Sequence, residues 1–368
     1  MTRFKPVVGV SEAVTLLFIF IAAKVFLTHV AFILHDGANA SWMIPLINIF
    51  IGLAGVLLLV AVLNKHPGQD LVETGEELTG PYINALFSLY YLLVFVVGAG
   101  FALRSVSERM VVGFLQDTPI SMVVLLFLAS TVTVAYLGLE AVARTARFLV
   151  SVLVVTTLAL VALTTPFWQW HAFFPIWGAG PWEVLQGALK NAGSFVHILL
   201  LGIIYPFLPA GKAKPIGVWG VLLAGFFMLV TVLVPLLIFT FPTTTELTFP
   251  TFETARIINI GRFGQRMEVL FLPIWVFGNM IFISASLYAG AAVLTRLFKL
   301  DDYRPFVPAV AVFTVVTAFV PRNASQVAYW DHQFIGGYSF WGLILILAVL
   351  FLAARFKGGG GAKNEKGA

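Results

Sequence analysis

The sequence predicts an all-α polytopic membrane protein with ten transmembrane helices. Of its 368 residues, 60% are hydrophobic and 11% are charged, whereas about a quarter are charged in a usual soluble domain. A helix of about 20 apolar residues crosses a bilayer and satisfies its own backbone groups in lipid. Ten such stretches are present, at about 11–34, 42–63, 82–103, 119–138, 147–165, 193–209, 216–240, 269–297, 306–321 and 338–355.

Ten spans divide into two halves of five, which predicts a five-plus-five inverted repeat. With an odd number of spans in each half, the second half enters the membrane from the opposite side. We expect a single transmembrane domain over residues 1–356, with a first repeat at about 9–165 and a second at about 193–356. Residues 357–368 are rich in Gly and Lys and are expected to form a disordered cytoplasmic tail.

The basic residues predict the orientation of these spans. If both termini are cytoplasmic, 14 Lys and Arg residues fall on the cytoplasmic side and 7 on the outer side. The positive-inside rule favours this arrangement, and an even number of spans places both termini on one side. Because the basic residues sort by side of the membrane, the net charge of +5 does not indicate nucleic-acid binding. We therefore expect the lipid bilayer, and no nucleic acid, as a partner.

Three connections are long enough to hold structure of their own. The cytoplasmic loop 64–80 predicts a turn and a short surface helix, whose acidic residues we interpret as a solvated face. The outer segment 166–192 is rich in Trp, as in an interfacial aromatic belt. The outer segment 241–268 predicts an amphipathic surface helix from Phe252 onward, with Glu253 and Arg256 on its wet side. It would equally suit a lid or a docking surface for a partner.

Spans one and six are the expected broken helices. In inverted-repeat transporters the first helix of each repeat is interrupted at mid-membrane, where half-helix N-termini attract carboxylates and free carbonyls bind cations. Span one has Ala23 and Lys24 at mid-depth. Span six contains Gly193 and Gly202, with Pro206 near its end. The matching positions of two unusual helices favour a ligand site between them.

Lys24 is the most informative single residue, because a cation at mid-membrane needs a partner. Its ammonium is suited to a ligand carboxylate, or to the place where related transporters hold a sodium ion. The structural alternative is a lysine that snorkels or contacts helix carbonyls. Snorkelling is difficult from mid-span, so we favour a functional role. No Asp or Glu lies deep in any predicted span to pair with it.

Other polar residues at membrane depth are weaker candidates. His197 lies one turn before the proposed break in span six, and His29 lies in span one. A lone membrane histidine is more often a hydrogen-bonded packing residue than a relay. Tyr91 places a hydroxyl in span three, and Ser284 and Tyr288 share one helix face in span eight.

No enzyme signature is present in the sequence. It contains no phosphate-binding loop, no His-Glu-x-x-His motif and no Gly-x-Ser-x-Gly motif. The six histidines show no metal-ligand spacing, and there is no cysteine. We therefore expect no catalytic residue, no metal site and no cofactor.

Several stretches, in their order and spacing, carry a family resemblance over nearly the whole chain. They are Ala40-Ser41-Trp42, His66-Pro67-Gly68, Gly138-Leu139-Glu140-Ala141, Pro206-Phe207-Leu208 and Arg262-Phe263-Gly264-Gln265-Arg266. Together they resemble the B subunit of GerA-type spore germinant receptors, a branch of the amino acid–polyamine–organocation transporter superfamily. No single stretch is diagnostic. The length of the chain and its ten spans fit the resemblance as well.

The resemblance implies a small nutrient ligand, often an amino acid, and a place in the spore inner membrane beside germinant receptor A and C subunits. Family ligand sites lie among spans one, three, six and eight. By position this implies the ligand-binding residues Ala23, Lys24, Tyr91, Leu199, Ser284 and Tyr288, to which we add His197 and Gly202 from the proposed break. The Ala23-Lys24 pair is a departure, because many relatives have a small residue or a glycine pair there.

Two functions fit the sequence. The first is a sensor that binds its nutrient in a transporter-like pocket and signals to partner subunits to start germination. The second is an active amino acid permease, with or without a coupled proton. A scaffold or channel component without a ligand is a weaker third. Binding and transport use the same pocket, so the resemblance to germinant receptors is what favours the sensor.

Overall fold

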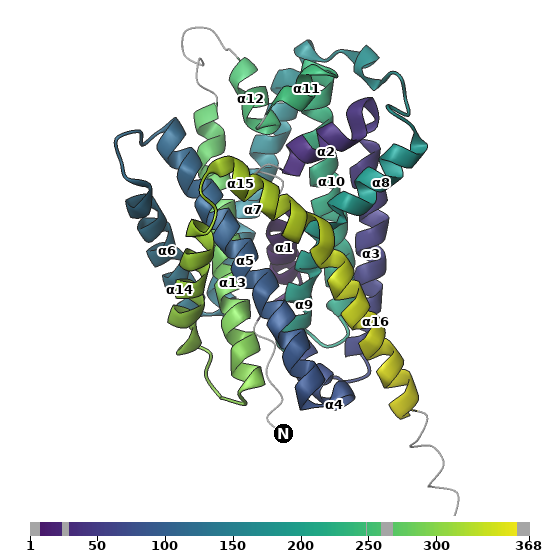
Figure 1. Cartoon of the computed structure of the whole chain (residues 1–368), viewed down its shortest axis with the longest axis vertical. Helices are drawn as coiled ribbons and strands as arrows, with labels where there is room; N and C mark the ends of the chain where they lie inside the picture. The colour runs from purple at the N-terminus through teal and green to yellow at the C-terminus, as the bar shows by residue number, and fades with distance from the viewer. Residues whose placement is uncertain (1–7, 24–28, 248, 259–267, 359–368) are drawn as a thin grey trace, which may run out of the picture.

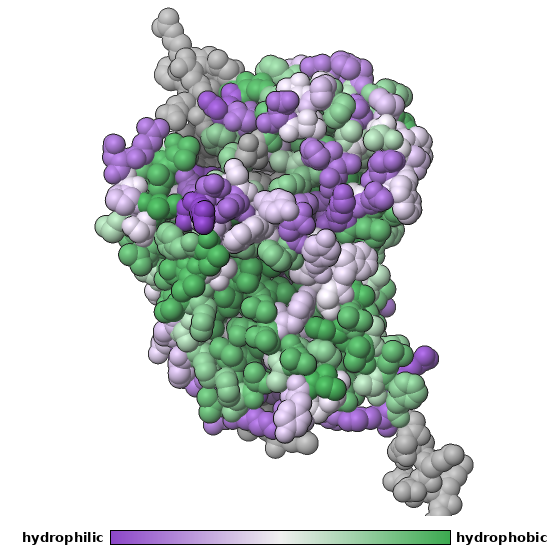
Figure 2. All heavy atoms as spheres, in the orientation of Figure 1, coloured by the Kyte–Doolittle hydropathy of each residue, from purple (hydrophilic) through white to green (hydrophobic). Residues whose placement is uncertain are grey.

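The computed structural model describes residues 8–23, 29–247, 249–258 and 268–358, with side chains described throughout except at 268–274 and 358. Within these ranges the chain is helical and contains no strand. The helices run mostly along the long axis of the molecule (Figure 1). Hydrophobic residues form a broad band on the visible surface, with hydrophilic residues gathered beyond both of its edges (Figure 2). This pattern is that of a bundle with a lipid-facing belt.

Helices lie on all ten predicted stretches. The first half comprises α1 (Val10–Ala22), α2 (His29–Gly37), α3 (Met43–Leu63), α4 (Leu71–Thr79), α5 (Pro81–Gly113), α6 (Ile120–Leu137) and α7 (Leu139–Thr164). The second half comprises α8 (Pro181–Asn191), η5 (Ala192–Ile198), α9 (Leu199–Ile204), η6 (Tyr205–Phe207), α10 (Ala213–Phe239), α11 (Thr243–Glu246), α12 (Pro250–Ile257), α13 (Glu268–Leu297), α14 (Phe306–Phe319), α15 (Ala324–Trp330), η8 (Asp331–Tyr338) and α16 (Ser339–Gly358). Among the described residues, eight helical runs are long and apolar enough to cross a membrane, and α1 and α14 are shorter apolar helices.

Span six departs from a regular α-helix within the described residues. Helix α1 ends at Ala22 and α2 begins at His29, and Lys24, the central sequence candidate, lies outside the described residues. In span six the expected interruption takes the form of a 3-10 helix, η5, that leads into the α-helix α9. Short 3-10 stretches inside a helix often mark functional hinges. The change of backbone lies in span six as expected, but at Ala192–Ile198, one turn earlier than the proposed break, and Gly202 lies in the regular helix α9.

Glycine sets how closely span six approaches span ten. A Cβ atom on Gly193 would overlap the backbone carbonyl of Gly336. Gly336 belongs to η8, a π-helical segment between α15 and α16. Irregular helical segments thus face one another at backbone contact, because neither residue has a side chain there.

Helix α1 lies inside the bundle and packs against α10, α7 and α13. Every residue from Leu16 to Ala23 is buried. A helix that is apolar on all sides is stable only where protein or lipid surrounds it. Helix α7, by contrast, has little of its apolar length buried within the protein, as expected for a lipid-facing helix.

The loop structures agree with the sequence in part. The predicted short helix in 64–80 is α4, but Asp70 at its start is buried rather than solvated. In α12 the side chain of Ala255 is buried and Arg256 is exposed, while residues 259–267 of the predicted amphipathic helix lie outside the described residues. The Trp-rich outer segment also contains the helix α8, which continues into span six.

Candidate functional site

Four spans converge on one buried aromatic cluster, which we call the central cluster. It comprises Phe20 of α1, Phe95 of α5, His197 of η5 and Phe282 of α13, all of them buried. The ring centroids of Phe20 and Phe282 are 4.8 Å apart, and those of Phe20 and His197 are 5.2 Å apart. The His197 and Phe282 centroids are separated by 5.1 Å. Spans one, three, six and eight therefore meet at a single histidine.

The backbone of η5 fixes how His197 presents its ring. The Nδ1 atom lies 2.8 Å from the carbonyl oxygen of Ser194. A carbonyl only accepts, so Nδ1 carries the proton, and in the neutral ring Nε2 is the accepting nitrogen. The hydroxyl of Ser194 lies 2.8 Å from Nε2 of His29 in α2. This chain of contacts links the two broken spans.

Gly98 of α5 forms a wall of the central cluster without a side chain. A Cβ atom built on Gly98 would lie 3.6 Å from Cζ of Phe282 and 4.0 Å from Nε2 of His197. Both are ordinary van der Waals distances, so a methyl group fits beside the two rings. The accepting nitrogen of His197 thus faces this bare stretch of α5.

Tyr91 lies on the same side of α5 as Gly98, two turns or about 10 Å nearer the α4 end. Its side chain is 0% exposed, and its hydroxyl has no hydrogen-bond partner among the described residues. The neighbouring Tyr90 differs, because its hydroxyl donates to the carbonyl of Ser339. A buried hydroxyl without a partner costs about 1–3 kcal/mol, so Tyr91 suits a bond to a bound ligand.

The other sequence candidates on spans one and eight are buried along the helices that carry Phe20 and Phe282. Ala23 caps the end of α1. Ser284 lies two residues beyond Phe282, and its hydroxyl donates to the carbonyl of Met280 at 2.7 Å. The ring of Tyr288 packs against that of Tyr303, with centroids 5.0 Å apart.

The two remaining candidates on span six lie in α9. Leu199, its first residue, is buried. Gly202 faces another direction, since a Cβ there would lie 3.2 Å from Leu71 of α4 and 3.3 Å from Leu59 of α3. Among the described contacts, Gly202 is therefore a helix-packing position, and the cluster around His197 is formed without it.

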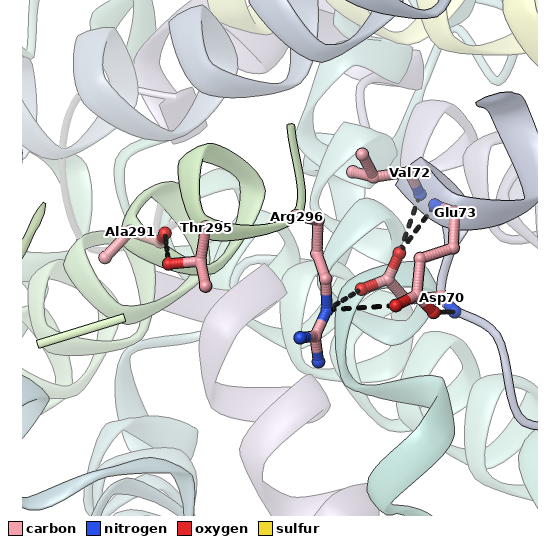
Figure 3. A network of polar contacts seen from close by, with 6 residues as sticks. All are labelled: Asp70, Val72, Glu73, Ala291, Thr295 and Arg296. Carbon is pink, nitrogen blue, oxygen red and sulfur yellow. Dashed lines mark hydrogen bonds and ion pairs between the residues drawn. The ribbon is translucent and has the colours of Figure 1, made fainter. Parts of the chain in front are cut away.

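A second polar group lies at the α4 end of the bundle (Figure 3). Asp70 caps α4 by accepting from the backbone N–H groups of Val72 and Glu73, both at 2.9 Å. Its other oxygen, Oδ2, lies 2.9 Å from Nε of Arg296 in α13. Arg296 Nε also lies 3.5 Å from Glu73. One carboxylate therefore joins α4 to span eight.

Burial dominates the electrostatics of Asp70. Removal from water, with a smaller contribution from the neighbouring Glu73 charge, raises the pKa of Asp70 to about 6. The backbone hydrogen bond and the Arg296 guanidinium act in the opposite direction and offset part of the increase.

Beside the pair is an open cleft of about 620 Å³, lined by Glu73, Glu76, Glu77, Pro81, Arg296, Lys299, Leu300 and Asp301. In the described part of the chain, no group of three His, Asp or Glu side chains is placed to hold a metal ion.

Sequence reasoning missed the aromatic half of the central cluster and the Asp70–Arg296 pair. The chain has 35 phenylalanines, so no local signal distinguishes Phe20, Phe95 and Phe282. The spacing of Asp70 and Glu73 is a recognisable capping pattern, but it does not indicate a partner 226 residues away.

The structure resembles solved transporters across almost its whole length. MhsT in complex with L-phenylalanine superposes with a TM-score of 0.66 at 13% identity, covering 94% of this chain and 95% of that one. Mhp1, a nucleobase-cation-symport-1 family transporter in a closed conformation with bromovinylhydantoin bound, gives 0.57 at 14% identity, covering 97% and 94%. These likenesses confirm the five-plus-five inverted-repeat fold.

Curated relatives come from Bacillus subtilis (strain 168). Spore germination protein KB is 25% identical over 265 residues, covering 70% of this chain and 71% of that protein. Spore germination protein B2 is 23% identical over 324 residues, covering 86% of each. The sequence model of the family described as "Spore germination protein" matches residues 8–327. With most of its length matched, this multi-pass membrane protein belongs to the spore germination protein family.

Proposed function

We propose that this chain is the nutrient-sensing membrane subunit of a spore germinant receptor and that it binds an amino acid at the central cluster. The observation that carries the proposal is the convergence of spans one, three, six and eight on His197 in a chain of this family. In the same fold, MhsT holds L-phenylalanine. Apolar rings around a few buried polar atoms suit recognition of a small solute.

The lining favours an amino acid with a small apolar side chain. Phe20, Phe95 and Phe282 supply apolar surface, and at Gly98 a methyl group would lie in ordinary contact with Phe282 and His197. Nε2 of His197 faces α5 at Gly98, and the buried hydroxyl of Tyr91 belongs to the same helix, two turns away. Lys24 remains our candidate for the ligand carboxylate, as a proposal from the sequence alone.

An active amino acid permease is the second candidate function. The transporter fold favours it, because the same pocket serves binding and passage. An open cleft also reaches toward the bundle from the α4 end. A coupled proton would be consistent with titratable groups such as Asp70 in that region.

The sensor proposal includes a cellular location and partner subunits. We place the chain in the spore inner membrane, with both termini cytoplasmic, beside germinant receptor A and C subunits. On ligand binding, movement of the broken spans would be passed to those subunits and start germination. The family match and the fold support the ligand-binding part of this scheme.

The deciding experiment uses purified protein in liposomes exposed to a panel of labelled amino acids, with bound and accumulated label recorded together. Saturable binding without accumulation supports the sensor, and saturable accumulation supports the permease. The His197→Gln variant should lose binding, whereas His171→Gln, at an exposed histidine, should retain it. Binding that survives in His197→Gln would exclude the central cluster as the ligand site.

A further inference from the structure

We propose that Asp70 and Arg296 form a proton-controlled latch that holds the α4 end of the ligand pathway closed. The latch is the only charge pair joining α4 to α13 that is buried on its acidic side within the described residues. Its role in ligand access rests on the proposed function, but its opening and closing do not require a ligand.

The position of the latch is the first step of the argument. Arg296 and Glu73 line the open cleft, so the pair lies where the cleft meets the bundle (Figure 3). On the bundle side, α4 packs against α5 and α13, the helices that carry Tyr91 and Tyr288. From Arg296, α13 runs fourteen residues, or about 21 Å, to Phe282 in the central cluster. The pair therefore stands between the cleft and the proposed pocket.

The chemistry of Asp70 is the second step. Its carboxylate is 1% exposed, so separation of α4 from α13 would return it to water. In the closed state the pKa of Asp70 is about 6, whereas the pKa of an exposed aspartate has the ordinary value of 3.8. The closed state therefore binds the proton more tightly, and acid favours closure. As the pH rises through about 6, Asp70 loses its proton in the closed state. The ionised carboxylate is better hydrated in the open state, so the equilibrium shifts toward opening.

The surrounding groups are few. Helix α4 packs against α5, α9, α13 and α16. Glu73 and Arg296 face Asp70 directly, and Tyr91 and Tyr288 lie within electrostatic reach. Helix α9 contributes no titratable side chain. The other charges nearby belong to separate contacts at the cleft rim, namely Lys299 with Glu76, His66 with Glu77, and Lys357 with the Glu77 carbonyl.

The test measures the separation of α4 and α13 directly. The chain contains no cysteine, so spin labels at Glu77→Cys and Leu300→Cys, on opposite walls of the cleft, attach nowhere else. Distance distributions in proteoliposomes are recorded from pH 5 to pH 8 without ligand. We expect a longer-distance population that grows with pH. Because the Asp70 pKa falls from about 6 to 3.8 on opening, the open-to-closed ratio rises at most on the order of a hundredfold.

Two substitutions should act in opposite directions. Asp70→Asn keeps a side chain that caps helices well but removes the charge, so the latch should stay closed at every pH. Arg296→Gln removes the counter-charge from a buried carboxylate, so the latch should be open already at neutral pH. Arg144→Gln, which breaks an exposed ion pair with Glu140 on α7, is the matched control and should behave as the wild type.

A wild-type distance distribution that does not change with pH would overturn the proposal, whatever the variants do. Equal widening in Asp70→Asn and Arg296→Gln would also overturn it, because that result indicates a contact with a merely structural role. The proposed function is tested separately by ligand binding in liposomes. A working latch without amino acid binding would thus reject the ligand assignment alone.

Discussion

At the residue scale, substitutions of two adjacent tyrosines should have different effects, one on ligand affinity and the other on stability. Tyr91→Phe removes a buried hydroxyl that has no partner among the described residues, so we expect an unchanged or higher melting temperature. If that hydroxyl bonds the ligand, the affinity should fall about fivefold, the equivalent of a bond of about 1 kcal/mol. Tyr90→Phe should instead lower stability by about 1 kcal/mol and leave binding intact, because Tyr90 donates to Ser339. Thermal melts and ligand titrations of both variants decide this, and weaker binding in Tyr90→Phe alone would contradict the site.

Gly98 tests the size of the pocket. Gly98→Ala places a methyl group in van der Waals contact with Phe282 and His197, where we expect it to exclude part of the ligand. Crowding of about 1–3 kcal/mol corresponds to an affinity loss of roughly five- to 150-fold. Gly113→Ala lies on the same helix with nothing within 4 Å of its Cβ and is the matched control. Alanine favours the helix by up to ~1 kcal/mol at either position, so both variants should remain stable. Equal affinities in isothermal titrations would remove Gly98 from the pocket.

At the scale of elements, the contact between η5 and η8 depends on Gly193. Gly193→Ala introduces a Cβ that overlaps the carbonyl of Gly336, and backbone on both sides leaves no flexible group to move. We expect a loss of at least about 3 kcal/mol, seen as a much lower melting temperature or poor recovery of folded protein. Gly278→Ala in α13, where the Cβ meets nothing within 4 Å, should melt as the wild type does. Similar melting of the two variants would show that spans six and ten need not approach so closely.

The elements themselves were predictable, and the site was predictable only in outline. Hydrophobic length places all ten spans, because nothing but helices satisfies the backbone in lipid. Periodicity cannot choose which phenylalanines meet, since Phe20, Phe95 and Phe282 come from helices whose relative rotation is set by packing. His197 was found because a titratable side chain in an apolar span is a local feature, although it lies within the irregular segment η5 and not before it. Asp70 was assigned to a solvated face because its burial depends on α13, far away in the sequence.

The whole molecule presents two chemically different ends. Helix α4 and the turn after α13 lie at one end, and the connection between α5 and α6 lies at the other (Figure 1). A belt of hydrophobic residues separates the hydrophilic edges (Figure 2). The surplus of Lys and Arg belongs to the α4 end, so the positive-inside rule predicts that this end, and with it the proposed latch, faces the cytoplasm.

This orientation predicts opposite reactivity for two exposed positions. A chain without cysteine permits single reporters at Asp117→Cys, between α5 and α6, and at Lys299→Cys, after α13. In intact cells an impermeant thiol reagent should label Asp117→Cys, and it should label Lys299→Cys only after the membrane is opened. Neither substitution touches the bundle interior, so expression should be normal. The reversed pattern would place α4 outside, where the acidity of a different compartment would act on Asp70, and the latch would then respond to external rather than cytoplasmic pH.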